Sequence, residues 1–241
     1  MVYLTEMVIE QMKNAQNAKQ GQNKVVIIQS LNNLQIMLPE LGYVNALRAY
    51  LEFNKIDYQI DERSNAEWMS PDGQLPLIKY GRQLVSGFLP IIEFINKQFE
   101  IKVNDISTER QAILDLFNKV IIDAELYYTW LDKDTFEKYT KFSYAYGKPW
   151  PLNNILCWLK RRDIAWRIQD DTNRQNSLEE FLREISRITS IPMDDDKAAS
   201  RELLCLIYGH IKAINSYDKT YEPLRKMVKQ YPSLLQFVEK F

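Results

Sequence analysis

Apolar positions in the first hundred residues follow strand-like and helix-like spacing in turn. Short aliphatic runs occupy 25–28 and 34–38, and Pro39 cannot continue a central strand. We predict a strand over 34–38, with the earlier run as an optional extra strand. From Val44, apolar residues recur every three or four positions, which predicts a helix, and the alternation over 57–61 predicts the next strand.

The following segment has the composition of a turn and a hairpin. Ser70-Pro71-Asp72-Gly73 places proline and glycine as a β-turn requires. It leads into an apolar run over 75–80 and, through Gly81, into a second short run over 83–86. Ser86 is expected to cap a helix that begins directly after it. Together these elements predict the order β-α-β-β-α.

Beyond residue 107 the apolar spacing is helical, and no strand pattern follows residue 100. One long amphipathic helix is expected after Thr108, another after Ser177, and the largely apolar segment 203–214 is expected at the centre of a bundle. A short amphipathic helix is also predicted in the first 20 residues. The chain is therefore expected to be an α/β unit followed by an all-α unit.

Composition narrows the classes of function. With 31 basic and 32 acidic side chains the net charge is −1, so no overall field attracts nucleic acid or an anionic membrane. Cys157 and Cys205 are expected to fill core space in a reducing compartment. The longest uncharged run, between Lys24 and Glu40, is shorter than the roughly 20 apolar residues of a spanning helix. We expect neither a membrane-spanning helix nor an import signal.

Motifs for metals and cofactors are weak. The single histidine, His210, lies in an apolar helical segment, where a buried histidine with a hydrogen-bond partner is expected rather than a base or metal ligand. The acidic run Asp194–Asp196 follows Pro192 and is expected to be solvated before the next helix. No phosphate-binding or zinc-protease motif is present in the sequence. We therefore predict no cofactor and no metal.

The order of elements resembles the glutathione transferase fold, in which a hairpin entered through an X-Pro precedes a helical bundle. Four segments resemble those of the metaxin family, and within it the metaxin 2 type: NAEWMSPDGQLPLI (65–78), AELYYTWLD (124–132), PWPLNNIL (149–156) and LIYGHI (206–211). The resemblance implies a thioredoxin-like N-terminal domain plus an all-α C-terminal helical domain. The expected parts are an N-terminal extension (1–33), the thioredoxin-like domain (34–100) and the helical domain (108–241).

This resemblance also implies a function. A chain of this type is a non-catalytic scaffold on the cytosolic face of the mitochondrial outer membrane, peripheral to the bilayer. Its implied partner is a metaxin 1-like subunit, which carries the membrane tail. The implied roles are outer-membrane protein import with the β-barrel subunit of the sorting and assembly machinery, and mitochondrial transport through the Miro GTPase and kinesin or dynein adaptor complexes.

We expect a glutathione groove that keeps its backbone features but lacks some of the polar side chains that bind glutathione. In the transferase fold the bond before the hairpin proline is cis, and Leu75-Pro76 stands at that place. Ser86 matches the serine that holds the glutamyl end of glutathione, but Val85 replaces its polar neighbour. Tyr43 is the candidate for the thiol-activating hydroxyl and is more simply explained as a packing residue. We therefore interpret Leu75, Pro76 and Ser86 as a vestigial groove.

Two alternative functions use the same groove. A soluble glutathione-dependent transferase or peroxidase would need an activating group, for which Tyr43 is the candidate. A small-molecule sensor would keep binding without turnover. Glutathione calorimetry and a turnover assay with an electrophile separate these two from a scaffold.

Aromatic residues are concentrated between Tyr127 and Trp150, where nine occur in 24 residues. Their spacing after residue 136 is not cleanly helical, so they cannot all face one core. Because Tyr and Trp anchor many interfaces, this segment either contacts a partner subunit or packs between helices. The partner-binding candidates are Trp130, Phe136, Tyr139, Phe142, Tyr144, Tyr146 and Trp150.

Basic residues follow in the next helical segment, beside Trp158 and Trp166. They are candidates for contact with a membrane headgroup or an acidic partner, and the alternative is a solvated helix face. These basic candidates are Lys160, Arg161, Arg162 and Arg167.

Overall fold

A computed structural model describes residues 24–101, 108–168, 174–189, 201–217 and 222–241. The helix predicted in the first 20 residues and the acidic run Asp194–Asp196 lie outside this part of the chain. The strands are β1 (Val25–Gln29), β2 (Tyr58–Glu62), β3 (Leu77–Tyr80) and β4 (Gln83–Ser86). The first helices are α2 (Leu38–Phe53), α3 (Ala66–Met69) and α4 (Phe88–Gln98).

The second half of the described chain is helical. A continuous run comprises α5 (Thr108–Phe117), the π-helical η1 (Asn118–Ile122), α6 (Asp123–Leu126) and the π-helical η2 (Tyr127–Leu131). The next run comprises α7 (Lys133–Thr135), the π-helical η3 (Phe136–Thr140) and α8 (Lys141–Tyr144). The remaining helices are α9 (Leu152–Arg167), α10 (Arg174–Thr189), α11 (Arg201–Ser216), α12 (Glu222–Lys229) and α13 (Pro232–Lys240).

The four strands form one mixed sheet in the order β2-β1-β3-β4. Strand β1 pairs with β2 in parallel and with β3 in antiparallel orientation, with Ile27 opposite both Ile60 and Ile78. Strands β3 and β4 form the predicted hairpin around Gly81, whose φ is 60°. The alternation of strand, helix, strand and hairpin in the sequence thus gives a thioredoxin-like sheet.

The strand predicted over 34–38 is wrong. The first strand is β1, which lies in the run predicted as an optional extra strand, and Leu38 already begins α2. The residues Ile36, Met37 and Leu38 are buried where the chain enters that helix, and they do not form a strand. Strand β1 is internal to the sheet, because it pairs with β2 on one side and β3 on the other. We therefore propose that the thioredoxin-like unit begins at Val25 rather than at residue 34.

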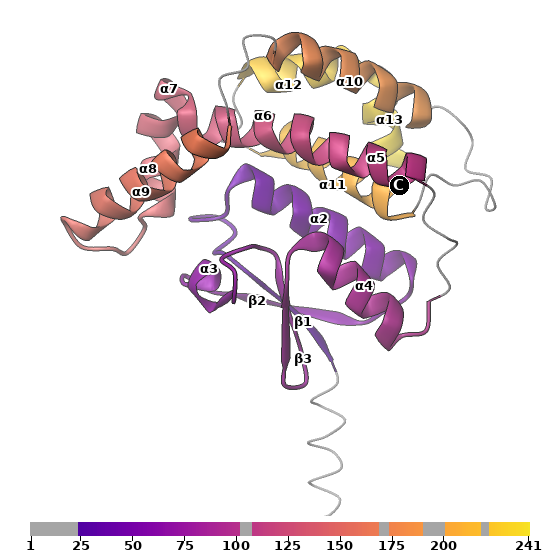
Figure 1. The fold of residues 1–241 in the computed structure, drawn as a ribbon, viewed down its shortest axis with the longest axis horizontal. Helices are drawn as coiled ribbons and strands as arrows, with labels where there is room; N and C mark the ends of the chain where they lie inside the picture. The colour runs from indigo at the N-terminus through magenta and orange to yellow at the C-terminus, as the bar shows by residue number, and fades with distance from the viewer. Residues whose placement is uncertain (1–23, 102–107, 169–173, 190–200, 218–221) are drawn as a thin grey trace, which may run out of the picture.

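Helices α2 and α4 cover one side of the sheet, and α11 lies across α2 below the α5–α6 helix (Figure 1). One continuous core joins the two units, since Ile27 and Leu47 belong to the same buried cluster as Leu206 and Ile211. Two glycines allow the close crossing of α2 and α11. A Cβ atom at Gly209 would lie 2.4 Å from the carbonyl oxygen of Gly42.

The elements α7, α8 and α9 form an arm that projects to one side of the bundle (Figure 1). The arm has a small core of its own, which includes Trp130, Phe136, Cys157 and Ile164. Asp132 begins it by capping α7, because its carboxylate accepts from the backbone N–H of Thr135 at 2.9 Å. The arm is therefore a separately packed extension of the helical unit.

Candidate functional site

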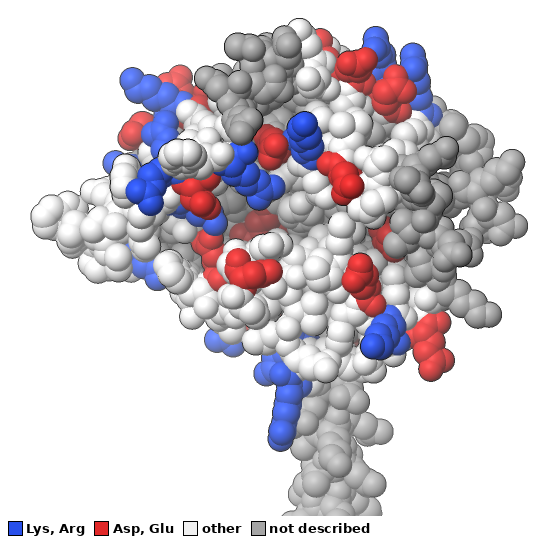
Figure 2. Space-filling view, viewed as in Figure 1, with Lys and Arg blue, Asp and Glu red and all other residues white. Residues whose placement is uncertain are grey.

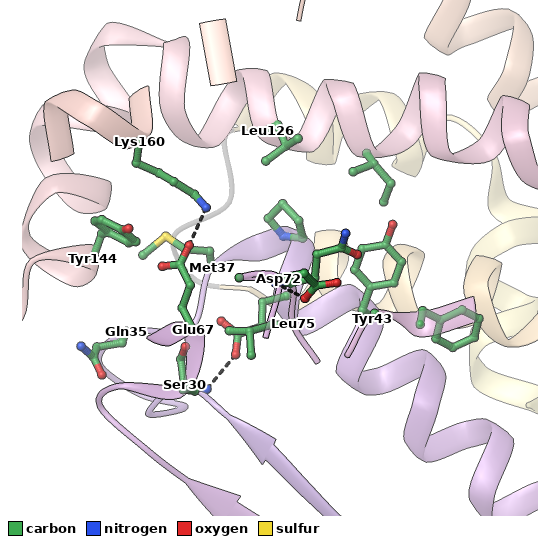
Figure 3. A pocket seen from close by; sticks show the side chains of 18 of the residues that line it. Ser30, Gln35, Met37, Tyr43, Glu67, Asp72, Leu75, Leu126, Tyr144 and Lys160 are labelled. Atoms are coloured by element: carbon green, nitrogen blue, oxygen red, sulfur yellow. Dashed lines mark hydrogen bonds and ion pairs between the residues drawn. The ribbon is translucent and has the colours of Figure 1, made fainter. Parts of the chain in front are cut away.

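A cleft of about 680 Å³ lies between the thioredoxin-like unit and the helical unit (Figure 3). The loop after β1, the start of α2 and the turn before β3 form one wall, and η1, α6 and α9 form the other. Its lining includes Met37, Glu40, Tyr43, Glu67, Asp72, Leu75, Asn118, Leu126, Tyr144, Lys160 and Arg167. This is the place where the sequence predicted a remnant of a glutathione groove.

The hairpin end of the cleft contains Leu75, one of the residues of the predicted groove. The Leu75-Pro76 bond is cis, as the resemblance implied, and Leu75 lines the cavity. The carbonyl oxygen of Pro76 accepts from the backbone N–H of Gly87 at 3.0 Å, so it is used within the fold. Val85 packs against the main core. The hairpin therefore brings the cis Leu75-Pro76 bond to the cleft without a polar side chain at Val85.

Ser86 does not cap α4 as predicted. Gly87, with a φ of 79°, occupies the N-cap position, and no side chain caps the helix there. The Ser86 hydroxyl instead donates to the carboxylate of Asp72, which lowers the pKa of that carboxyl group. Asp72 also accepts from the backbone N–H of Gln74 at 3.1 Å. Ser86 thus stabilises the turn before β3.

Tyr43 lies in the second turn of α2, so the register behind its choice as an activating hydroxyl is wrong. Its hydroxyl donates to Oδ1 of Asn118 at 3.0 Å, and burial raises the pKa of the phenol above its ordinary value. The ring stacks on Phe88 and meets His210 edge-on. Its proton is engaged and its ring is packed, as the simpler interpretation of Tyr43 predicted.

Two carboxylates, those of Glu40 and Glu67, line the cleft, and neither was predicted from the sequence as a cleft residue. Glu40, in the first turn of α2, accepts from the backbone N–H of Ser30 at 2.7 Å, and burial raises its pKa to about 7. Glu67, on α3, pairs with Nζ of Lys160 at 2.5 Å across the cleft (Figure 3). The hydroxyl of Tyr144 also donates to Glu67. The cleft therefore contains charges that already have partners within the protein.

His210 is buried with a partner, as predicted. Its Nδ1 atom lies 2.9 Å from Oε1 of Glu125, and both side chains are fully buried. Sequence reasoning missed Glu125 as that partner. The available signal was that Glu125 follows Ala124, an apolar position on the predicted long helix after Thr108, which indicates a buried place for the carboxylate.

The two cysteines also fill core space, as predicted. Burial raises the pKa of both thiols, that of Cys205 to about 12, so neither is poised as a thiolate. Within the described residues, no three His, Cys, Asp or Glu side chains gather as ligands for a metal ion.

The aromatic segment divides into two groups. Trp130 and Phe136 are buried, and Tyr144 packs against them in the core of the arm. The exposed group is Tyr139, Phe142, Tyr146 and Trp150. The structure therefore brings three of the seven partner-binding candidates into packing and leaves four at the surface.

The four basic candidates point to different surroundings. Lys160 and Arg167 line the cleft, and Nε of Arg167 lies 3.8 Å from Oδ1 of Asp123. The guanidinium of Arg161 lies over the ring of Phe136, and that of Arg162 over the ring of Trp158. Among these four, Arg161 and Arg162 therefore lie on aromatic rings rather than beside acids.

Among the described helices, none has the length and apolar character needed to cross a bilayer.

The family described as outer mitochondrial membrane transport complex protein, Tom37, matches residues 45–161. That range includes most of the cleft lining and most of the arm, up to Arg161 in α9. The family description agrees with the outer-membrane location expected from the sequence.

Similarity to individual proteins extends over more of the chain. Metaxin-2 of Homo sapiens is 29% identical over 226 residues, which cover 89% of this chain and 86% of that protein. Metaxin-1 of Homo sapiens is 26% identical over 149 residues, 59% of this chain and 32% of that protein. A glutathione S-transferase from Methylobacillus flagellatus, solved with glutathione bound, has a TM-score of 0.53 at 12% identity and covers 90% of this chain. The expected resemblance is thus confirmed: the chain is similar to metaxin-2 over most of its length, and its fold is that of a glutathione transferase.

Proposed function

We propose that this chain is a non-catalytic, peripheral subunit on the cytosolic face of the mitochondrial outer membrane. It pairs with a metaxin 1-like subunit and acts in the import of outer-membrane proteins. Support comes from the similarity to metaxin-2 over most of the chain and from the outer-membrane transport family that matches its middle.

The state of the cleft is the observation that carries this proposal. A transferase needs a group that lowers the pKa of the bound thiol, and it needs polar anchors for the peptide. Here the hydroxyl of Tyr43 donates to Asn118, Ser86 donates to Asp72, and Val85 offers no polar atom. Lys160 and Glu67 pair with each other across the space. The cleft therefore favours a scaffold over an enzyme.

The direct test is purification of the tagged chain from mitochondria, with identification of the bound proteins. A metaxin 1-like subunit and the β-barrel subunit of the sorting and assembly machinery are expected. Recovery of the Miro GTPase with kinesin or dynein adaptors would support the further role in mitochondrial transport. A chain recovered without any of these proteins would contradict the proposal.

A glutathione-dependent transferase or peroxidase is the second candidate, since the fold is that of a transferase. Turnover of glutathione with a chromogenic electrophile would establish it. We expect no turnover above the uncatalysed rate. Calorimetry with glutathione tests a sensor role in the same samples, and we expect no heat of binding.

A further inference from the structure

Exposed apolar side chains are concentrated on the arm. Of the 18 large apolar side chains that are exposed in the described residues, nine lie between Tyr139 and Trp166. Scattered exposed apolar residues are normal on a soluble protein, but such a concentration marks an interaction surface. The arm therefore presents a surface that the protein itself does not cover.

Helix α9 contributes most of this surface. Its exposed apolar residues are Leu152, Ile155, Trp158, Leu159 and Trp166. Intervals of three, four and seven place them on one side of the helix, along about 24 Å for its 16 residues. The side toward the arm's core buries only Cys157 and Ile164. The wider apolar side of this amphipathic helix thus faces outward.

Helix α8 and the turn between α8 and α9 extend the surface. Phe142 is 69% exposed and Trp150 is 79% exposed, and Trp150 stands between Pro149 and Pro151. In the space-filling view the projecting end of the arm carries no charged side chains, and basic ones appear behind it (Figure 2). We call Phe142, Trp150 and the exposed apolar residues of α9 the arm surface.

Charge around the arm surface is positive. Residues 136–168 contain seven basic and two acidic side chains, a net charge of +5 in a chain whose total is −1. Among the described residues, no carboxylate pairs with Lys138, Lys148 or Arg162 within 4 Å, whereas Lys160 pairs with Glu67. Lys148 is half-buried and lines the cleft, whereas Lys138 and Arg162 are exposed and are available to an anionic surface.

We propose that the arm surface docks onto an anionic phospholipid bilayer. Tryptophan beside aliphatic residues favours the boundary between headgroups and acyl chains, and flanking Lys and Arg favour phosphate. A convex projection whose visible face carries no charged side chain can enter a bilayer without a partner of matching shape. The inference rests on the proposed function, because a peripheral subunit of that membrane needs a surface that contacts lipid.

The test is flotation of the full chain with vesicles of phosphatidylcholine alone and of phosphatidylcholine mixed with phosphatidylserine. We expect binding to the mixed vesicles to be at least about tenfold tighter. The triple variant Trp150→Ser/Ile155→Ser/Trp158→Ser should bind the mixed vesicles at least about tenfold more weakly. The control Leu84→Ser/Leu116→Ser changes exposed apolar residues outside the arm and should bind as the unchanged chain does.

A charge variant separates the two contributions. Lys138→Gln/Lys148→Gln/Arg162→Gln should remove most of the preference for the mixed vesicles. Because the changed positions are exposed, apart from the half-buried Lys148, circular dichroism should report the same helix content in every variant. Quenching of tryptophan fluorescence by brominated lipid should be strong in the unchanged chain and weak in the triple variant.

Absence of vesicle binding, or binding that the triple variant retains, would overturn the inference. If the triple variant instead loses capture of the metaxin 1-like subunit and keeps its vesicle binding, the arm surface is a protein interface and the inference is wrong. A chain that binds vesicles as expected but captures no such subunit supports the inference and contradicts the proposed pairing.

Discussion

Nδ1 of His210 lies 2.9 Å from Oε1 and 3.0 Å from Oε2 of Glu125, and solvent reaches neither side chain. The pair joins α11 to α6 at the centre of the helical unit, with the rings of Tyr43 and Phe117 against the imidazole. Burial raises the pKa of Glu125, and the interaction with His210 opposes that shift. The pair is therefore a structural link behind the cleft.

Replacing Glu125 tests the importance of this link. Glu125→Ala leaves a buried imidazole without its partner and should lower the free energy of unfolding by about 3 kcal/mol or more. Glu125→Gln keeps an oxygen that can accept from Nδ1, so it should cost clearly less. Urea denaturation followed by circular dichroism measures both. Equal losses in the two variants would show that the hydrogen bond is unimportant.

The crossing of α2 and α11 depends on Gly209. A Cβ atom at this position would lie 2.4 Å from the backbone nitrogen of Ala46, and backbone atoms cannot move aside easily. Gly209→Ala should therefore destabilise the protein by about 3 kcal/mol, although alanine favours helix. The control Lys212→Ala, at an exposed position of the same helix, should stay within about 0.5 kcal/mol. Thermal melts of both variants measure these changes in stability. A Gly209→Ala variant as stable as the unchanged protein would contradict the close crossing of α2 and α11.

Glu40 makes the stability depend on pH. Burial raises its pKa from 4.5 to about 7, so between these values the folded protein binds a proton that the unfolded chain releases. The contribution of Glu40 to the stability is therefore fully present below pH 4.5. This contribution is lost as the pH rises through 7, where the buried carboxyl group ionises. The loss amounts to at most about 3 kcal/mol.

The variant Glu40→Gln isolates this effect. Glutamine keeps an acceptor for the backbone N–H of Ser30, but it cannot ionise. Relative to the unchanged protein, the variant should gain up to about 3 kcal/mol at high pH and little at low pH. Urea midpoints measured across the range from acidic to mildly alkaline pH provide the comparison. Parallel curves for the two proteins would contradict the raised pKa.

Periodicity predicted most of the fold, and it failed where two apolar runs competed for one strand. The runs at 25–28 and 34–38 look alike in sequence, because both are rich in aliphatic residues, although Leu34 is exposed in the structure. Only the sheet distinguishes them, since β1 pairs on both sides while Ile36 and Leu38 lead into α2. Long helices and the hairpin were safer predictions, because their spacing extends over more residues.

The candidate site was harder to predict than the fold. Misplacing the strand moved the expected activating position and left Glu40 unnoticed at the start of α2. Acids such as Glu67 look like ordinary surface residues, because sequence spacing does not show which of them faces a cleft. In the aromatic segment, the π-helical stretches η2 and η3 rotate successive side chains away from regular spacing, which mixed buried and exposed rings.

The ion pair of Lys160 with Glu67 connects the arm to the thioredoxin-like unit. Lys160 was a candidate for contact with a headgroup, but its Nζ lies 2.5 Å from the carboxylate of Glu67, and about two thirds or more of each side chain is buried. Lys160→Met should therefore lower the stability by about 1 kcal/mol. It should also speed amide hydrogen exchange in α9 more than in α11, because α9 loses a tie to the body.

A double-mutant cycle separates this pair from its surroundings. Lys160→Met, Glu67→Gln and the double variant should give a coupling energy of about 0.5–1 kcal/mol, which high salt reduces. Tyr144 also donates to Glu67, so the single change at Glu67 should cost more than the change at Lys160. Lys138→Met is the matched control, because no described carboxylate pairs with Lys138, and it should leave exchange in α9 unchanged. A coupling energy of zero would mean that the arm is held by its apolar contacts alone.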